Sequence, residues 1–328
     1  MKRLILLMAL CLLLFLANLF FGSVHLPADV VASVLCGDSA DATAAFIVVQ
    51  HRLPMAVTAM LVGAALAVAG LLLQTTFHNP LAGPSVFGIS GGASLGVAIL
   101  MLGGVAHSVN PGDGMVVLYL AAFVGAMAVT LVLLAVSTVV SDNVVLLIVG
   151  LLFGYLVSAA ITLLYAVANP DNLQQYVVWG MGDFSSVSLT QLRRLAMPVV
   201  TLLLVSLLLV KPLNALLLGD SYAANLGVNI RRVRNFILLV VGLLTAITTT
   251  YCGPVAFLGL AVPHVARLVM PTADFRWRLP STMLVGAAVA LLCSLLCTLP
   301  TNTILPLNAV TPMIGVPVIV WVIISKRR

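Results

Sequence analysis

Long apolar runs alternate with short polar breaks along the whole chain, and Pro, Gly and charged residues mark the breaks. An α-helix needs an apolar run of about 20 residues to cross the hydrocarbon core of a bilayer. The pattern therefore predicts an all-α polytopic membrane protein, a single transmembrane domain over residues 1–328. The expected ten spans are 4–22, 53–76, 86–104, 115–139, 144–168, 194–210, 234–251, 254–270, 281–299 and 306–324. Since ten is even, we expect both termini on the same side of the membrane.

The first apolar run follows Lys2 and Arg3, an arrangement that resembles a signal peptide. It is longer than the usual signal core of about 7 to 15 residues, and no small-x-small cleavage site follows it. We therefore expect a retained first span. Beyond it, residues 23–51 and 169–191 are long enough to form structure outside the membrane, and HLPADVVASVL in the first of them predicts a short interfacial helix.

A polar stretch between the sixth and seventh predicted spans, Lys211–Arg234, has signals for short helices. Asp220 can cap a helix over residues 221–226, and Gly227 can take the left-handed conformation that ends it. Asn229 can then cap the next helix. The helix dipole disfavours cations at an N-terminus, yet this helix would begin with Arg231, Arg232 and Arg234. A cytosolic membrane surface is one reason to place arginines there.

Charged residues make up only 7% of the chain, and the mean hydropathy is +1.23. No hydrophilic stretch is long enough for a soluble catalytic or nucleotide-binding domain. The net charge of +6 comes from residues at span ends, which membrane topology explains better than nucleic-acid binding. If both termini are cytosolic, the basic residues inside are Lys2, Arg3, Lys211, Arg231, Arg232, Arg234, Arg267, Arg276, Arg278, Lys326, Arg327 and Arg328. Those outside are only Arg52, Arg193 and Arg194, an imbalance that agrees with the positive-inside rule.

No Asp, Lys or Arg lies near the middle of a predicted span, and the chain contains no Glu. Proton- or sodium-coupled carriers usually place ionisable groups there, so an ion-coupled secondary carrier is disfavoured. The energy for transport should therefore come from outside the chain. No Cys or His cluster has metal-ligand spacing, and the i, i+4 pair Cys293 and Cys297 is better explained by packing.

A motif rich in proline and glycine, HNPLAGPSVFGISGGASLG, follows the second predicted span. Asn79, Pro80 and Pro84 cannot continue a regular helix. Gly88 and Gly92 then open the next helix with little side-chain bulk. This pattern favours a hinge and a close-packed helix start beside a pathway, and an ordinary tight turn between helices stays open as the alternative. No GK[ST] sequence follows the glycines, which argues against a phosphate-binding loop.

The eighth predicted span contains CGPVAFLGLAVPHVARL, with Gly259 and Pro263 inside the apolar run. Proline within a span frees a backbone carbonyl, so we expect a kink near the cytosolic end. His264 and Arg267 are three residues apart and share one helix face. We expect these residues to belong to the pathway or its hinge, and a structural role for His264 is the alternative.

Three motifs, taken in order, carry a resemblance to a known family: NPLAGP with the later GISGGA, GD followed by LGV, and FLGLAVPHVAR. The chain resembles the permease subunits of ATP-driven importers for iron siderophores, haem and vitamin B12, from RLP at Arg52 to the GVPV phrase near the C-terminus. The resemblance implies the type II importer permease fold with about ten transmembrane helices, in the bacterial cytoplasmic membrane.

The resemblance also implies a set of partners. These are a second copy of the chain, two cytosolic ATPase subunits and an extracytoplasmic substrate-binding protein, in addition to membrane lipid. ATP and Mg would be held by the ATPase subunits, so the chain itself is expected to bind no cofactor or metal and not to be an enzyme.

By the same resemblance, the helix that enters a cleft on the ATPase falls on residues 219–227. The ATPase-coupling residues are then Gly219, Asp220, Ser221, Leu226, Gly227 and Arg231. Relatives often have Glu where this chain has Ser221, which puts one polar contact in doubt. In this family, arginines of the permease pair with acidic residues of the binding protein, so the candidates for docking are Arg52, Arg193 and Arg194. Arg52 could equally anchor the end of its span.

The alternative from another class of function is an intramembrane serine hydrolase, because GISG at residues 88–91 matches a GxSG nucleophile phrase. Ser90 would be the nucleophile and His264 the base, although no group is evident to orient that base. For the importer, a pathway of apolar, amide and hydroxyl groups without fixed charge suits a bulky chelate. We expect a ferric siderophore as the cargo, with haem or a corrinoid such as vitamin B12 as alternatives.

Overall fold

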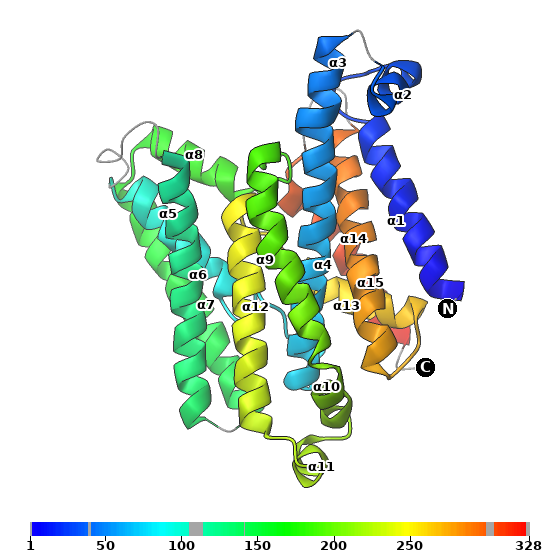
Figure 1. Ribbon diagram of the computed structural model, residues 1–328. Coiled ribbons are helices and arrows are strands. Elements are labelled where there is room, and N and C mark those ends of the chain that lie inside the picture. Colours follow the sequence, from blue (N-terminus) through cyan, green and yellow to red (C-terminus); the bar gives the residue numbers. More distant parts are fainter. Residues whose placement is uncertain (1, 39–40, 105–113, 141, 300–304, 326–328) are drawn as a thin grey trace.

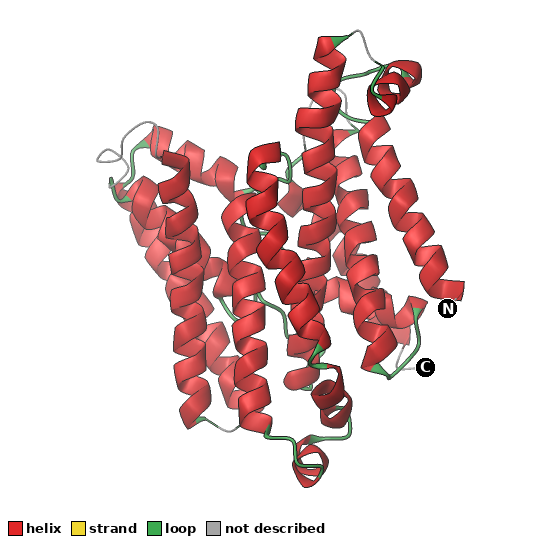
Figure 2. Ribbon diagram, in the orientation of Figure 1, coloured by secondary structure: helices red, strands yellow, loops and turns green. Residues whose placement is uncertain are grey.

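The computed structural model describes residues 2–38, 41–104, 114–140, 142–299 and 305–325, with side chains to residue 321. All secondary structure in these ranges is helical (Figures 1 and 2). The elements are α1 (Lys2–Phe20), α2 (Ala28–Cys36), α3 (Ala42–Phe46), the π-helix η1 (Ile47–Arg52), α4 (Leu53–Thr76), α5 (Ile89–Leu102), α6 (Gly114–Val139), α7 (Asn143–Val167), α8 (Pro170–Gly180), α9 (Leu189–Leu207), α10 (Val210–Leu216), α11 (Asp220–Asn225), α12 (Ile230–Cys252), α13 (Leu258–Val269), α14 (Phe275–Thr298) and α15 (Leu307–Ser325). Lys326, Arg327 and Arg328, which the topology assigns to the cytosol, lie outside the described residues.

Seven helical segments in the described ranges are long and apolar enough to cross a membrane: α1, the continuous α3–η1–α4, α6, α7, α9, α12 and α14. Three shorter apolar helices, α5, α13 and α15, lie among them. Each predicted span overlaps one of these helices. The eighth span begins four residues later than expected, because Gly253 (φ 69°) and Phe257 (φ 65°) have positive φ values and keep residues 253–257 out of the helix, and α9 and α14 begin five and six residues earlier than expected. The predicted interfacial helix near residue 30 corresponds to α2.

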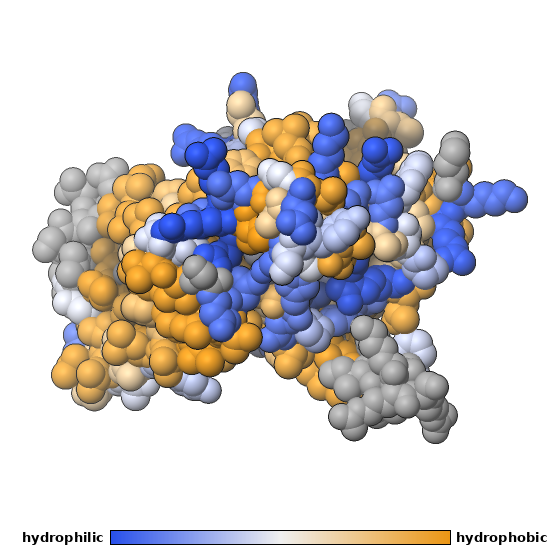
Figure 3. Space-filling view, turned by 90° about the horizontal axis from the view of Figure 1, so that it is seen from below, coloured by the Kyte–Doolittle hydropathy of each residue, from blue (hydrophilic) through white to orange (hydrophobic). Residues whose placement is uncertain are grey.

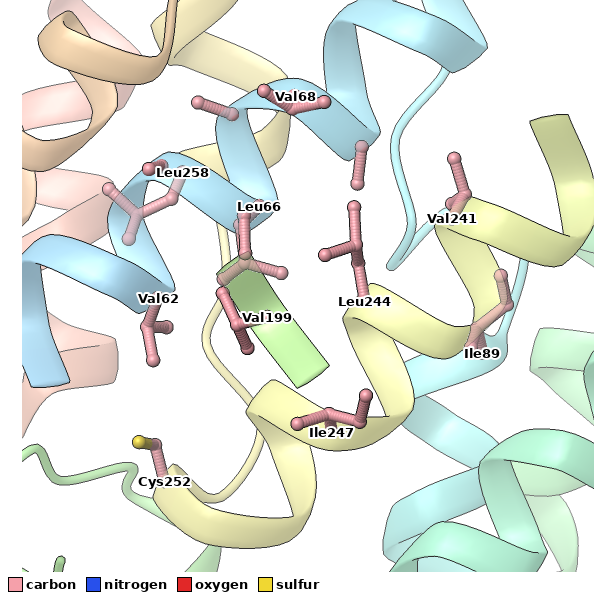
Figure 4. Packing of buried hydrophobic residues seen from close by; sticks show 14 of the residues in the cluster. Val62, Leu66, Val68, Ile89, Val199, Val241, Leu244, Ile247, Cys252 and Leu258 are labelled. Atoms are coloured by element: carbon pink, nitrogen blue, oxygen red, sulfur yellow. The ribbon is translucent and has the colours of Figure 1, made fainter. Parts of the chain in front are cut away.

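The central helix of the bundle is α4, and nearly all of its residues are buried. Its sequence is apolar all round rather than on one face, as expected for a helix surrounded by others. It packs against α9, α12, α13 and α14. Figure 4 shows Val62 and Leu66 of α4 close to Val199 of α9 and Leu244 of α12. Helices α1, α6, α7 and α9 have much larger exposed fractions and form the rim.

Small residues let the helix backbones approach closely at the crossings of α4 with α13 and of α5 with α6. A Cβ atom added to Gly70 would overlap the carbonyl oxygen of Gly259 on α13. A Cβ atom added to Gly92 would lie 2.5 Å from the carbonyl oxygen of Gly125 on α6. Backbones this close gain dispersion contacts that larger side chains would prevent, which is how helices associate in lipid.

The two ends of the bundle differ. The end that carries α2, α3 and α8 lies at the top of Figure 1, and α11 projects from the opposite end. Seen from that second end, hydrophilic side chains gather over the middle of the surface and apolar areas flank them (Figure 3). We refer to these as the α2 end and the α11 end.

Candidate coupling site

The short helix α11 (Asp220–Asn225) is not capped as the sequence predicts. Its N-cap is Gly219, with a φ of 99°, and no side chain caps it. Asp220 is instead the first helical residue, and its Oδ2 atom accepts a hydrogen bond from Nδ2 of Asn143 at 3.3 Å. The prediction of an Asp220 cap is therefore wrong. The predicted end of the helix is confirmed, since Gly227 is left-handed with a φ of 82°.

The outer face of α11 is exposed and partly apolar. Tyr222 and Leu226 are 52% and 58% exposed, and Ser221 is exposed as well. Ala223 is fully buried and packs in a small apolar cluster with Ala215 and Leu216 of the preceding segment. A projecting helix with an open tyrosine and leucine is suited to enter a cleft on another protein. Tyr222 was missed by the sequence interpretation, although its place within the predicted helix was a usable signal.

The helix that follows α11 begins as the sequence predicts. The side chain of Asn229 accepts a hydrogen bond from the backbone amide of Arg232 at 3.0 Å and caps α12. Arg231 and Arg232 are exposed. Arg234, by contrast, is only 3% exposed. A membrane surface is therefore not needed to explain Arg234, and its contacts inside the protein supply the reason for its position.

Arg234 joins α12 to the connection between α6 and α7. Its Nη2 donates to the carbonyl oxygens of Ser137 and Val140, at 2.8 and 2.7 Å, and its Nε donates to the hydroxyl of Ser137 at 3.0 Å. Its Nη1 donates to Oδ1 of Asn143 at 3.3 Å. Burial of a guanidinium group is tolerable here because backbone and side-chain oxygens replace the lost water.

Asn143 connects this buried arginine to α11. Its amide group accepts from Arg234 and donates to Asp220, and Nδ2 also donates to the carbonyl oxygen of Thr76 at 3.2 Å. The residues Asp220, Asn143 and Arg234, which we call the coupling network, thus tie α11 to the ends of α4, α7 and α12. Motif reading did not identify Asn143, because its partners lie far away in the sequence.

The loop between α4 and α5 is held from two sides. His78 at its start has a φ of 49°, and its Nε2 donates to the carbonyl oxygen of Leu216 in α10, at 3.0 Å. His264 of α13 is buried, and its Nε2 donates to the carbonyl oxygen of Pro80 at 2.9 Å. The loop therefore links the segment beside α11 to α13.

The residues predicted for the pathway and hinge are partly brought together. Pro84 and Gly259 line a small cavity with Ser90 and two threonines of α12, Thr245 and Thr249. The other predicted residues do not line the cavity. Gly88 is the left-handed N-cap of α5, Asn79 accepts a hydrogen bond from the amide of Leu81, Pro263 is buried inside α13, and Arg267 is half-buried at the end of that helix.

Ser90 and His264, the residues of the hydrolase hypothesis, have different surroundings. Ser90 lines the cavity, whereas His264 is not among the residues that line it and bonds to Pro80. No group of three His, Cys, Asp or Glu side chains that could hold a metal ion occurs in the described part of the chain. These surroundings give the hydrolase hypothesis no support.

The three candidate docking arginines fall into two kinds. Arg52 is 5% exposed, and its guanidinium group donates to the carbonyl oxygens of Leu19, Phe20 and Val24. These are the contacts of an anchor between α1 and α4, so Arg52 has no part in the docking surface proposed below. Arg193 and Arg194 are exposed in the first turns of α9 at the α2 end.

Comparison with known proteins places the chain among transport permeases. The family model of the FecCD transport family matches residues 10–325. The chain is 32% identical over 313 residues to the ferric enterobactin transport system permease protein FepD of Escherichia coli K12, covering 95% of this chain and 91% of that protein. It is 32% identical over 278 residues to the hemin transport system permease protein HmuU of Yersinia pestis, covering 84% and 83%.

A vitamin B12 import system permease protein, BtuC of Citrobacter koseri, is 33% identical over 296 residues, covering 89% of this chain and 87% of that protein. A solved structure of a metal-chelate type ABC transporter in an inward-facing conformation superposes with a TM-score of 0.87 at 26% identity and covers 99% of both chains. The similarity therefore extends over the whole transmembrane bundle and is not confined to short motifs.

Proposed function

The chain belongs to the FecCD transport family, and we propose that it is the permease subunit of an ATP-binding-cassette importer that carries a ferric siderophore across the cytoplasmic membrane. Relatives named for ferric enterobactin, hemin and vitamin B12 transport support this class of cargo and leave haem and corrinoids as alternatives. A chain without Glu and without charges near its span centres suits a bulky chelate that the pathway must not grip.

We further propose that α5, α13 and α15 complete ten membrane segments together with the seven longer ones. Both termini and α11 then face the cytosol, in agreement with the excess of basic residues at that end. The partners proposed are a second identical copy, two cytosolic ATPase subunits that hold ATP and Mg, and an extracytoplasmic binding protein. Arg193 and Arg194 are the residues proposed to meet acidic groups of that binding protein.

The observation that carries the proposal is the form of α11: a projecting helix with exposed Tyr222 and Leu226 that is tied firmly to the bundle behind it. ATP-driven closure of the ATPases would displace α11 as a rigid lever. Through Asp220 and Asn143 the displacement reaches the ends of α4 and α7. Such rigid-body coupling between packed helices is a common route to alternating access.

A second route runs through the loop between α4 and α5. Movement of α10 would displace His78 and with it the loop. The loop would in turn displace α13 through the hydrogen bond between His264 and Pro80. Pro84 of this loop and Gly259 of α13 line the same cavity. The proposed hinge residues therefore lie between the energy input and the pathway.

The experiment that tests this function is co-purification of the ATPase subunits with a tagged permease that carries Tyr222→Asp and Leu226→Asp. Both side chains are exposed, so the bundle should fold normally. We expect the variant to lose its ATPase subunits. The matched control is Leu35→Asp, a 45% exposed residue of α2 at the opposite end, which should retain them. Full recovery of the ATPases with the double variant would overturn the coupling assignment.

A further inference from the structure

Two arginines at the α11 end, Arg267 and Arg278, each bury the Nε atom of the guanidinium group without an acceptor. Arg278 of α14 is 5% exposed, and Arg267 at the end of α13 is half-buried. The Nε atoms of both are buried and make no hydrogen bond. Within the described ranges, the contact that Arg278 makes is a cation–π contact with Phe275, 5.2 Å from the ring centroid. The two positive charges also repel one another.

The other buried arginines of the described chain have a different environment. Arg52 donates to three carbonyl oxygens, and Arg234 donates to two carbonyl oxygens and two side chains. Burial of a guanidinium without such acceptors is costly. The protein supplies oxygens wherever it buries an arginine by itself, so Arg278 indicates an acceptor that is not part of the described chain.

The surroundings of Arg278 carry an excess of positive charge. Arg3 of α1 reaches the same place, since its Nη1 donates to the carbonyl oxygen of Val269 at 3.1 Å. The nearest carboxylate along the chain, Asp274, accepts through Oδ1 from Nδ2 of Asn214 and from the amide of Arg276, and within the described residues no ion pair joins it to Arg278. The missing acceptor should therefore be an anion.

This basic site lies on the rim of the bundle where α14 packs against both α1 and α13 (Figure 1). The rim next to it is apolar and open: Ile5 and Leu6 of α1 and Leu268 of α13 are exposed. Trp277 is exposed beside Arg278, as is common for tryptophan at the boundary between lipid tails and water. An anion with attached hydrocarbon chains would match both parts of this surface.

We propose that Arg3, Arg267 and Arg278 bind the phosphate of an anionic phospholipid whose acyl chains lie along α1. Phosphate oxygens accept two parallel hydrogen bonds from a guanidinium group, and basic pockets between helices on the cytosolic side are suited to anionic head groups. A carboxylate of the ATPase is the less favoured occupant, because α11 projects at some distance from this apolar rim. The proposed lipid site does not depend on which cargo the importer carries.

The test uses the purified full chain in nanodiscs of phosphatidylcholine alone or with phosphatidylglycerol, and it measures the midpoint of thermal unfolding. Phosphatidylglycerol should raise the midpoint of the wild-type protein by several degrees. The variant Arg278→Leu should unfold at a higher temperature than the wild type in phosphatidylcholine, since it removes an unpaired buried charge. It should gain little from phosphatidylglycerol.

The control is Arg232→Gln, which removes an exposed positive charge from the same end and should keep the full response. Native mass spectrometry should give a preference for phosphatidylglycerol over phosphatidylcholine that falls about tenfold in Arg278→Leu. An equal response of Arg278→Leu and wild type would overturn the proposal.

Two further outcomes would also overturn it. If millimolar inorganic phosphate stabilises the wild type as much as phosphatidylglycerol does, the site binds free anions. If Arg278→Leu keeps its lipid response but loses the ATPase subunits on purification, a protein carboxylate is the occupant.

Discussion

Replacement of Arg234 by Met tests the coupling network at its most buried member. Methionine has a similar length and no polar donor, so the change removes the guanidinium group and leaves its acceptors behind. The carbonyl oxygens of Ser137 and Val140, bonded at 2.8 and 2.7 Å, would lose their charged donor. The Oδ1 atom of Asn143 would lose the donor that holds the amide group in place, with its Nδ2 donating to Asp220.

The magnitude follows from these contacts. A hydrogen bond to a charged group contributes about 1.5–3 kcal/mol, and a buried acceptor left without a donor costs about 1–3 kcal/mol. With two buried carbonyl oxygens left without their donor, we expect the free energy of unfolding of Arg234→Met to fall by about 3–5 kcal/mol. The free energy of unfolding of Arg234→Lys should lie between those of the wild type and Arg234→Met, because an ammonium group cannot reach all four acceptors at once.

The assay is unfolding of the purified protein in mixed micelles by added sodium dodecyl sulfate, followed by circular dichroism. Arg232→Met is the matched control, since Arg232 is exposed two residues away and its hydrogen bond to Asn229 comes from the backbone amide. This control should change stability by no more than about 0.5 kcal/mol. A loss below about 1 kcal/mol in Arg234→Met would refute the reasoning, because it would mean that the buried bonds contribute little.

Two further predictions concern packing and pH. Gly70→Ala should lower the free energy of unfolding by about 1–3 kcal/mol, because the added methyl group overlaps a carbonyl of α13. The control Gly180→Ala, with open space around it, should have little effect in the same denaturation assay. The amide of Arg276 and then the side chain of Asn214 hold the pKa of Asp274 below its ordinary value of 3.8. A carboxyl whose pKa is depressed by folding stabilises the folded state above its ordinary pKa, and this stabilisation is lost as the pH falls through the depressed pKa. The wild type should therefore lose more stability than Asp274→Asn between about pH 5 and 2. Equal losses would contradict this.

The sequence pattern predicted the helices well because their signals are local or averaged over many residues. Apolar runs identified the regions that became α1, α4, α6, α7, α9, α12 and α14. Gly227 and Asn229 were recognised because a left-handed turn and an N-cap depend on neighbours within a few residues. The shortening of α13 was not predicted, because nothing in the composition of residues 253–257 requires Phe257 to be left-handed.

The candidate site was predicted only where its chemistry is local. Asp220 was placed on the right helix but with the wrong partner, since Asn143 is 77 residues away in the chain. Arg52 looked like an outward charge, and its three carbonyl partners at the end of α1 cannot be read from its neighbours. The contacts of Asn308, which donates to the carbonyl oxygens of Gly180 and Pro254, likewise depend on segments that meet only in the folded chain.

The central claim is that the energy for transport enters through α11. The direct test reconstitutes the permease with its ATPase subunits and binding protein in proteoliposomes and measures ATP hydrolysis and ferric siderophore uptake together, with the amount of permease in the membrane determined in parallel. For Asp220→Ala with Gly227→Ala, we predict that hydrolysis continues while uptake falls at least about tenfold. The control is Asp171→Ala, which changes an exposed acidic residue of α8 at the opposite end. It should leave the ratio of siderophore uptake to ATP hydrolysis unchanged. Unaltered uptake in the double variant, at equal protein level, would contradict the account.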